Sequence, residues 1–511
     1  MTAKCIMVQG TGSSVGKSRL VTGLCRVFKQ DGFKVVPFKS QNMALNSYIT
    51  KDGLEMGRAQ ASQAEACGVE PSVLMNPVLL KPHTDKDCQV IVKGRPIGSF
   101  SATAYHEYKT KLLNVVKECY DELAQDNDIV VIEGAGSPAE INLRDKDIVN
   151  MGMAELVDAP VVLVGDIDRG GVFASLAGTM LLLSEEEKAR VKGVIINKFR
   201  GDIKLLEPGI KMLEDIINRP VLGVIPYTDI YIDEEDSPEE ERQRLLKKYE
   251  DNNDTYPQQK PLQVKILSLP RITNFTDFVP LAEFGVKLSY VSGGQIGEAH
   301  MVVIPGSENP KESMEFIKAK GWDKELERLH KIGAVILGVG SSFLLLGKTF
   351  TSPLSDSITE GLGFFDAHIE LLKQKPARVR GEVAPSLPGE ARSLSNVVVE
   401  GYRIYSGEIT LKGETEKEFI KVESNKSDFD GLVSDTGRVI GTFLHGIFDN
   451  TNFTRQFVNY LNSIRFCDYV FYNTHNFDFI KYKEAEFDRW ADVVRNSLDI
   501  EMLYRIMGIR V

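Results

Sequence analysis

Cysteine is scarce in this chain of 511 residues, and its six cysteines are scattered. They form no CxxC pair and no dense framework, so a structural zinc site is not expected. We expect free thiols in a reducing compartment instead. The six are Cys5, Cys25, Cys67, Cys88, Cys119 and Cys467.

Long apolar stretches are absent as well. No uninterrupted apolar run approaches the length that spans a membrane, and the first residues are apolar only briefly and lack a signal-peptide pattern. We therefore expect a cytoplasmic protein without a membrane partner.

Positive charge is also in deficit. The 61 lysines and arginines face 72 acidic residues, which gives a formal net charge of −11. A nucleic-acid backbone is held by clustered Lys and Arg, so this balance argues against a general nucleic-acid binder, although local basic pockets remain open. The length exceeds what one hydrophobic core usually serves and predicts two domains, or three.

Strands alternate with helical stretches, such as Tyr108–Ala124, through the first part of the chain, 1–228. This alternation predicts an α/β domain with a doubly wound, mainly parallel sheet that binds ligands at the carboxyl ends of its strands. The strand-like runs are Val35–Pro37, Ile129–Ile132, Val161–Val164, Val194–Ile196 and Leu222–Ile225.

The composition changes between residues 229 and 260, which include EEDSPEEE and YEDNND. We interpret this stretch as a solvated acidic linker, because such charge runs are more often surface than site. A second α/β domain is predicted over 261–511, ending in a helical tail around Tyr482–Met507. Its strand-like runs are Val264–Leu267, Lys287–Val291, Met301–Ile304, Ala334–Leu337 and Val439–Thr442.

A glycine-rich turn joins the first strand, Lys4–Val8, to a helix with apolar residues at helical spacing. Such a turn binds phosphates through its backbone N–H groups and the helix dipole, while the lysine adds a charge and the serine can ligate Mg²⁺. The spacing is a variant, with a threonine where the usual first glycine would fall. The predicted nucleotide-binding residues are Gly10, Thr11, Gly12, Ser13, Ser14, Val15, Gly16, Lys17 and Ser18.

Polar side chains after three other strands are predicted to face this loop. Glu133 is a candidate Mg²⁺ ligand, and Lys39 can stabilise charge on a transferring phosphoryl group. Asn197 can read a purine edge by its side-chain amide while the stem of Lys198 lies along the base. A solvated carboxylate, a surface lysine and ordinary turn residues remain the alternatives.

Eight segments carry a family resemblance, and several of them are far too long to recur by chance: VQGTGSSVGKS, PFKSQNMALNS, GRAQASQAEACGVEPSVLMNPVLLKP, VVIEGAGSPAEINL, VVLVGDIDRGGVFASL, VKGVIINKFRGD, LPRITNFTDFVPL and GTFLHGIFDN. Together they resemble the cobyric acid synthase family, the glutamine-dependent amidases of cobalamin biosynthesis. The resemblance implies a P-loop NTPase-like doubly wound parallel sheet, followed by a class I glutamine amidotransferase-like (flavodoxin-like) α/β domain.

The resemblance also implies an activity. ATP and Mg²⁺ would be used to phosphorylate side-chain carboxylates of a corrinoid, adenosylcobyrinic acid a,c-diamide, and ammonia would then give the amides at positions b, d, e and g. Cations are needed to dock several propionates. The candidates for this role are Arg58, Lys81, Arg144 and Arg169.

The chain departs from the family at the glutaminase site. The nucleophilic cysteine of the family corresponds here to Gly340, which has no side chain with which to form a thioester, whereas His445 matches the family's histidine. We therefore expect a dead glutaminase site and ammonia taken free or from a separate glutaminase. Ser341 or Ser342 as a replacement nucleophile is the alternative.

Two other readings of the whole chain remain open. The first is a non-catalytic carrier or scaffold for a corrinoid or nucleotide, descended from the synthetase. The second is an ATPase of the partitioning or metal-insertion type, which would not be expected to carry the long second half.

Overall fold

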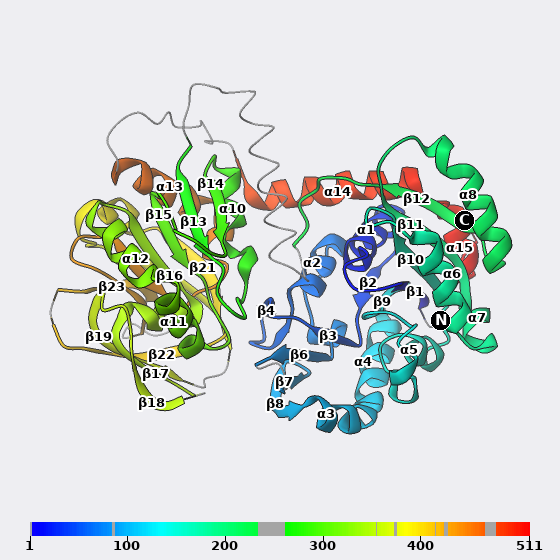
Figure 1. Ribbon diagram of the computed structural model, residues 1–511, viewed down its shortest axis with the longest axis horizontal. Helices are drawn as coiled ribbons and strands as arrows, with labels where there is room; N and C mark the ends of the chain where they lie inside the picture. Colours follow the sequence, from blue (N-terminus) through cyan, green and yellow to red (C-terminus); the bar gives the residue numbers. More distant parts are fainter. Residues whose placement is uncertain are drawn as a thin grey trace. The chain divides into compact units, whose positions relative to one another are not determined.

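The structure, a computed structural model, describes residues 3–83, 87–233, 261–353, 355–372, 376–413, 415–423, 428–464 and 477–510. The chain forms two compact units (Figure 1). Unit 1 comprises the described parts of 1–44, 56–236 and 483–511, and unit 2 those of 45–55 and 237–482. Most of the predicted acidic linker, 229–260, lies outside the described residues. Within the described ranges, no helix combines the length and apolarity needed to cross a membrane.

Unit 1 is built on a six-stranded sheet in which every neighbouring pair is parallel. The first strand, which leads into the glycine-rich turn, lies inside the sheet and pairs with two others. All five strands predicted by apolar runs in this part of the chain are present, which confirms the doubly wound sheet. In spatial order they are β12 (Val221–Pro226), β11 (Val191–Phe199), β10 (Val161–Asp166), β1 (Lys4–Gly10), β9 (Ile129–Glu133) and β2 (Val35–Phe38).

Helices cover both faces of this sheet. The main ones are α1 (Lys17–Gln30), α2 (Arg58–Cys67), α4 (Leu113–Asp126), α5 (Met151–Leu156), α6 (Val172–Leu182), α7 (Glu185–Arg190) and α8 (Ile203–Ile217). Successive strand residues point to opposite faces. Ile6 and Val8 of β1 thus join Leu20 and Leu24 of α1 in one core. The predicted helix Tyr108–Ala124 is divided into α3 (Ala102–Tyr108), a 3₁₀ turn and α4.

The C-terminal tail packs in the core of unit 1, although the sequence assigned it to the second domain. It forms α14 (Phe479–Ser497) and α15 (Ile500–Met507). Trp490 and Val494 pack so closely on α1 that a Cβ at Gly23 would lie 2.6 Å from Val494. Helical periodicity shows that a helix buries one face, but it does not identify the sheet that the face covers.

Unit 1 also contains a small second sheet, and two more short strands lie near residues 45–57. A four-stranded sheet of β3 (Gln41–Met43), β6 (Val78–Pro82), β7 (Asp87–Val92) and β8 (Arg95–Ser101) follows the Lys39 segment. The short strand β4 (Ser47–Ile49) lies in the segment 45–55 of unit 2, and β5 (Glu55–Gly57) begins at the end of that segment. No apolar run in the sequence had predicted these strands.

Unit 2 is built on a nine-stranded sheet whose first five strands are parallel and flavodoxin-like in order. These are β14 (Lys287–Val291), β13 (Gln263–Leu267), β15 (Met301–Ile304), β16 (Val335–Val339) and β25 (Val439–Thr442). Each matches a predicted run, so the flavodoxin-like fold class is confirmed.

The other strands of unit 2 are almost all antiparallel and were not predicted. The main sheet continues through β24 (Phe429–Val433), β23 (Lys417–Val422), β20 (Ala377–Val383) and β21 (Val398–Arg403). A separate sheet contains β18 (Ser355–Glu360), β17 (Gly347–Ser352), β19 (Phe365–Leu372) and β22 (Ser406–Leu411), in which β17 and β19 are parallel.

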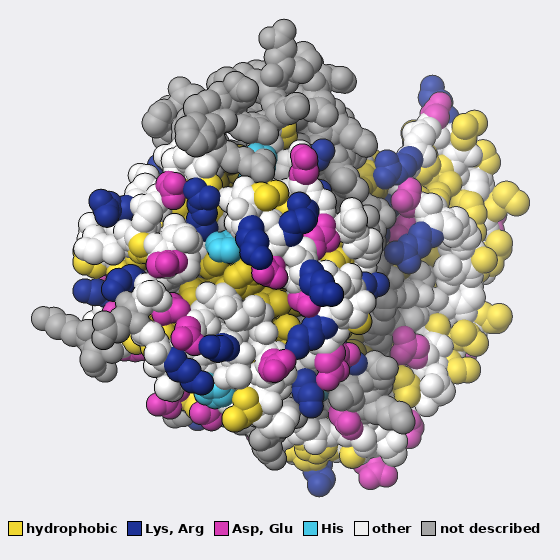
Figure 2. All heavy atoms as spheres, turned by 60° about the vertical axis from the view of Figure 1, so that its left-hand side comes forward, with side chains coloured by type: hydrophobic (Ala, Val, Ile, Leu, Met, Phe, Trp, Pro, Cys, Tyr) yellow, Lys and Arg dark blue, Asp and Glu magenta, His cyan; other side chains and the backbone are white. Residues whose placement is uncertain are grey.

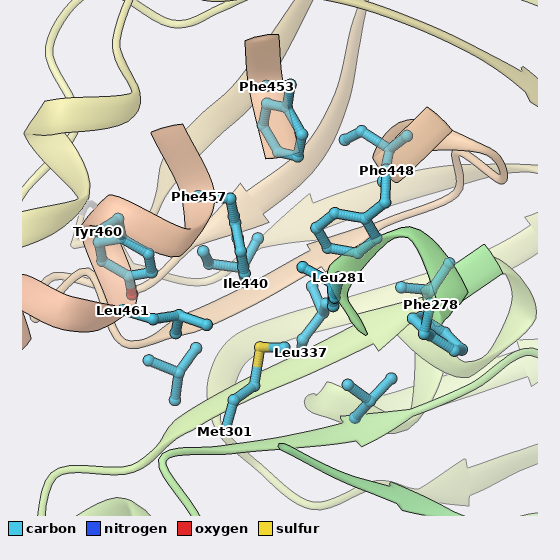
Figure 3. Close-up of a cluster of buried hydrophobic side chains, with 14 of the residues drawn as sticks. Phe278, Leu281, Met301, Leu337, Ile440, Phe448, Phe453, Phe457, Tyr460 and Leu461 are labelled. Carbon is cyan, nitrogen blue, oxygen red and sulfur yellow. The ribbon is translucent and has the colours of Figure 1, made fainter. Parts of the chain in front are cut away.

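Two hydrophobic cores lie on opposite faces of the main sheet of unit 2. Met301 and Val303 face one core, and Val302 and Ile304 face the other. The first core is covered by α10 (Val279–Glu283) and α13 (Thr451–Ile464). Figure 3 shows the aromatic side chains of α13 above the strands. The second is covered by α11 (Pro310–Ala319) and α12 (Trp322–Lys331).

Candidate functional site

The glycine-rich turn forms a compact loop between β1 and α1. Gly16 has φ +97°, a conformation that favours glycine, and an added Cβ would lie 2.2 Å from the side-chain Nδ2 of Asn197. The Lys17 ammonium donates to the carbonyl oxygens of Gly12 at 2.8 Å and Gly136 at 3.1 Å, so it is held against the loop. The sequence thus places a cation and a helix N-terminus at one point, which favours an anionic ligand.

Glu133, at the carboxyl end of β9, connects the predicted catalytic residues. Its Oε1 accepts from Ser18 Oγ at 2.7 Å and from Lys39 Nζ at 2.8 Å. Its Oε2 accepts from Gln63 Nε2 at 2.6 Å. The carboxylate is 1 % exposed, so its charge is balanced by Lys39 within the protein rather than by water.

Gln63 is a site residue that sequence reasoning missed. It lies on α2, is completely buried, and also donates to the Ser18 carbonyl at 3.4 Å. The signal was present in the helical segment GRAQASQAEA, where polar residues occupy positions that the fold buries. The sequence alone did not show how this helix is rotated about its axis, and therefore did not show which of these residues faces Glu133.

The residues can accommodate Mg²⁺ and a nucleotide. Mg²⁺ prefers oxygen ligands, and Ser18 Oγ and Glu133 Oε1 are close enough to touch one cation. The Gln63 Oε1 atom is buried and has no hydrogen-bond partner in the structure, which leaves an acceptor beside the carboxylate. A Cβ at Gly12 would meet nothing within 4 Å, so space remains on that side of the loop.

Asn197 and Lys198 lie beside the loop, but both side chains bind its backbone. Asn197 Nδ2 donates to Val15 O at 2.8 Å, and Lys198 Nζ donates to Ser14 O at 2.7 Å. Lys198 also pairs with Asp166 at 3.2 Å. These contacts position the loop, and the purine-reading role of the two residues stays a prediction.

The four predicted docking cations lie in different environments. Arg58 is buried and pairs with the buried Asp233 at 3.0 Å, and Arg144 pairs with Glu187 at 2.8 Å. Lys81 is completely buried in β6, whereas Arg169 is exposed after β10. The structure does not gather the four into one surface, so their docking role also stays a prediction.

Asp233 anchors the C-terminal tail to α2. Burial alone would raise the pKa of this carboxyl, but the adjacent Arg58 and Lys483 cations outweigh it and lower the pKa to about 2. Tyr231 Oη also donates to Asp233 at 3.0 Å. This cluster therefore acts between elements of unit 1.

A second polar cluster lies at the carboxyl ends of β16 and β25 in unit 2. Gly340 begins the turn after β16 with φ +61°, and a Cβ added to it would lie 2.5 Å from His445 Nε2. His445 Nδ1 lies 2.7 Å from Asp277 Oδ2, and Asp277 Oδ1 accepts from Gly446 N at 3.2 Å. The imidazole thus occupies the space that a side chain at position 340 would need.

His445 is held from several sides. Its ring stacks on Tyr402 with centroids 5.8 Å apart, and the two residues exchange backbone hydrogen bonds of 2.9 and 3.0 Å. Tyr402 Oη in turn bonds with Asn274 Nδ2 at 2.7 Å and with the Ser47 carbonyl at 3.1 Å. Asp277, Asn274 and Tyr402 had not been predicted as site residues, although LPRITNFTDFVPL contains two of them.

The two alternative nucleophiles near Gly340 are engaged elsewhere. Ser341 Oγ donates to Ser307 O at 2.6 Å, and Ser342 Oγ donates to Pro305 O at 2.5 Å. Both side chains are buried, and neither hydroxyl is bonded to His445. The described part of unit 2 contains no cysteine, because Cys467 lies outside it.

Comparison with protein families matches each half of the chain separately. Residues 6–239 match the CobQ/CobB/MinD/ParA nucleotide binding domain. Residues 263–453 match the CobB/CobQ-like glutamine amidotransferase domain. These descriptions agree with the glycine-rich loop and parallel sheet of unit 1 and with the parallel strand order of unit 2.

Curated relatives match the chain over nearly its whole length. Cobyric acid synthase of Caldanaerobacter subterraneus subsp. tengcongensis is 51% identical, and that of Thermoanaerobacter sp. (strain X514) is 48% identical, with 98% of each chain covered. That of Streptococcus sanguinis is 47% identical, with 99% of each chain covered. The two folds, the loop with its Lys17, Ser18 and Glu133 cluster, and this full-length similarity show together that the chain belongs to the cobyric acid synthase family of amide-forming enzymes in cobalamin biosynthesis.

Proposed function

We propose that this chain is a cytoplasmic, ATP- and Mg²⁺-dependent ligase that amidates the b, d, e and g carboxylates of adenosylcobyrinic acid a,c-diamide with free or externally supplied ammonia. A carboxylate is a poor acyl donor because its oxide is a poor leaving group. Bound ATP with Mg²⁺ would supply the phosphoryl group that makes each carboxylate reactive as an acyl phosphate. Ammonia would then form the amide and release phosphate.

The residues around Glu133 support the first half of this proposal. Lys17, fixed by two carbonyl oxygens, would neutralise the phosphates at the loop. Ser18 and Glu133 would hold the cation, and Gln63 would fix the carboxylate orientation. Lys39 would stabilise the negative charge that develops during transfer, because it is buried and already directed at this carboxylate.

Gly340 is the observation that carries the second half, the use of ammonia rather than glutamine. A glutaminase of this type needs a nucleophile within reach of its histidine. At position 340 there is no side chain, and an added Cβ would lie only 2.5 Å from His445 Nε2. The His445–Asp277 pair alone offers a base without a nucleophile, and loss of one member of such a unit typically reduces turnover by several orders of magnitude.

Steady-state assays of the full chain test the proposal. With corrinoid diamide, ATP and Mg²⁺, ammonium should support amide formation, and glutamine alone should not. Lys17→Ala should abolish turnover, whereas Lys34→Ala, at an exposed lysine before β2, should retain it. Efficient use of purified glutamine without a partner would overturn the nitrogen-source proposal. Tight corrinoid binding that never stimulates ATP hydrolysis would favour the carrier alternative.

A further inference from the structure

The surface charges are mixed on the face of the molecule that Figure 2 shows. Lys, Arg, Asp and Glu side chains are interspersed there, and mixed charge of this kind does not select an ionic ligand. Buried polar side chains are more informative, because each must find a hydrogen-bond partner or cost free energy. One of them, Asn150 of unit 1, was not predicted as a site residue, yet it contacts the loop that follows Glu133.

Asn150 and Lys17 bind the same short loop at the end of β9. Asn150 Nδ2 donates to Ala135 O at 2.6 Å, and Lys17 Nζ donates to Gly136 O at 3.1 Å. Asn150 is 4 % exposed, so its contact with the loop is shielded from water. Two adjacent carbonyl groups are thus held by a buried amide and by the cation that we expect at the phosphates.

The contact with Ala135 requires a hydrogen-bond donor. The carbonyl oxygen is an acceptor, so a carboxylate oxygen in place of Asn150 Nδ2 would repel it. The oxygen of the same amide faces Gly134, where an added Cβ would lie 2.4 Å from Asn150 Oδ1 and 3.1 Å from Gln9 Cγ. Gly134 N also donates to Val8 O at 2.8 Å, which keeps the loop in register with β1. The side chain of Asn150 therefore packs tightly against the loop.

Asn150 belongs to a tight turn, residues 147–152, that leads into α5. Asp147 Oδ1 accepts from Val149 N at 2.8 Å and from Asn150 N at 3.0 Å. Asp147 Oδ2 accepts from Gly152 N at 3.0 Å, and a Cβ added to Gly152 would lie 2.0 Å from Asp147 O. The 147–152 turn therefore has little freedom of its own and fixes the position of Asn150.

The 147–152 turn also binds the segment that carries Lys39. Ser40 Oγ donates to Ile148 O at 2.7 Å, and both residues are 1 % exposed. Lys39 directly precedes Ser40, and its Nζ lies 2.8 Å from Glu133 Oε1. One turn therefore contacts the segments on both sides of this ion pair.

We propose that Asn150 is a positioning residue for phosphoryl transfer. It acts through the loop after Glu133, which the 147–152 turn fixes relative to Lys39. The inference rests on the proposed function, because that function assigns the reacting phosphoryl group to Lys17 and Lys39. Preorganised charges stabilise a transition state only while they are correctly placed, and a displacement of about 1 Å can lower the rate about a hundredfold.

Steady-state kinetics of two variants tests this role. Asn150→Ala removes the donor, and Asn150→Asp keeps the shape but turns an oxygen toward Ala135 O. With corrinoid diamide and ammonium, both should lower kcat for ATP consumption about 10–100-fold, while the KM for ATP stays within about threefold because the glycine-rich turn itself is unchanged.

Asn127→Ala is the matched control for these variants. Asn127 Nδ2 also donates to a backbone carbonyl of unit 1, Leu123 O at 2.8 Å. It precedes β9 and so lies at the opposite end of that strand from Glu133. Asn127→Ala should therefore keep the wild-type kcat.

A double-mutant cycle tests whether the turn is shared. Ser40→Ala should lower kcat about 3–10-fold, because it removes one hydrogen bond to the 147–152 turn. If Ser40 and Asn150 act through the same turn, the variant Ser40→Ala/Asn150→Ala should lose less than the product of the two separate losses. Losses that multiply would overturn the proposal, since they would show independent effects.

Hydrogen–deuterium exchange gives a readout that does not depend on turnover. Exchange in peptides that span residues 134–140 should be faster in Asn150→Ala than in wild type, and unchanged in Asn127→Ala. A wild-type chain that consumes ATP without forming an amide from ammonium would overturn the proposed function, and the exchange result would then decide the role of Asn150. Unchanged exchange in Asn150→Ala, or a wild-type kcat in both Asn150 variants, would overturn the positioning role.

Discussion

The position of His445 against Gly340 predicts an unusual cost for adding one methyl group. Gly340→Ala places a Cβ 2.5 Å from His445 Nε2 and 2.6 Å from its Cε1, at a residue with φ +61°. The left-handed backbone alone costs about 1–2 kcal/mol for an L-residue. The imidazole must also move away from Asp277, which costs a further 1–3 kcal/mol or so, because it disturbs a buried hydrogen bond. The total is about 2–5 kcal/mol.

A second glycine of the same unit separates these two contributions. Gly321 has φ +70°, and an added Cβ would meet nothing within 4 Å. Gly321→Ala should therefore show the backbone strain alone, about 1–2 kcal/mol. In a His445→Ala background, Gly340→Ala should lose its excess over Gly321→Ala, because the side chain that it meets has been removed.

Urea unfolding measured by tryptophan fluorescence provides the assay. The chain has two tryptophans, Trp322 buried in unit 2 and Trp490 in unit 1. A Trp490→Phe background shared by all variants therefore restricts the signal to unit 2. Equal midpoints for Gly340→Ala and Gly321→Ala would refute the reasoning, since they would mean that position 340 has room for a side chain.

Three further predictions concern unit 1. Burial would raise the pKa of Asp233, but two neighbouring cations lower it to about 2. The carboxylate should therefore add about 2 kcal/mol to the free energy of unfolding above pH 4, and this contribution should be lost as the pH falls toward 2. Thermal unfolding at a series of pH values measures the loss, and Asp233→Asn should remove this pH dependence. Gln63→Leu should lower the rate of ATP-dependent amidation about 10–100-fold while the fold is retained, because the substitution removes the hydrogen bond that holds Glu133 Oε2. The kcat with ammonium as nitrogen source measures this loss. Gly16→Ala should weaken nucleotide binding, measured by calorimetry, far more than Gly32→Ala. Gly32 is the matched control because it also has a positive φ, +93°, but an added Cβ there would meet no atom within 4 Å.

Each of these predictions has a contradicting result. A stability profile in acid that is the same for wild type and Asp233→Asn would show that the carboxyl is not stabilised by its cations. Unchanged kcat in Gln63→Leu would remove this residue from the site. Equal nucleotide affinity in Gly16→Ala and wild type would show that the loop does not depend on the close approach of Asn197.

The parallel strands of both units could be predicted because they are buried on both faces and form continuous apolar runs. Most of the antiparallel strands of unit 2 have both buried and exposed positions and carry charges. In β20, Val379 and Val383 are buried while Arg378 and Glu382 are exposed, so an alternating signal was present but too weak to separate from a loop. The tail could not be assigned to unit 1, since its core partners are far away in the sequence.

The clustering of the candidate nucleotide-site residues could be predicted in part because the carboxyl ends of parallel strands meet at one edge. Lys39 directly follows β2, Glu133 ends β9, and Lys39 Nζ lies 2.8 Å from Glu133 Oε1. This rule does not predict which side chains on helices and loops lie close together. The pairing of Arg58 with Asp233, 175 residues away, and of His445 with Asp277 depends on tertiary packing that no local pattern encodes.

Isotope tracing of the amide nitrogen tests the central proposal most directly. The full chain is supplied with corrinoid diamide, ATP, Mg²⁺, heavy-isotope ammonium and unlabelled glutamine together, and each product amide is analysed by mass spectrometry. We predict that every new amide carries the heavy nitrogen, because Gly340 cannot release ammonia from glutamine. Light nitrogen entering the product from glutamine in the purified protein would contradict the account.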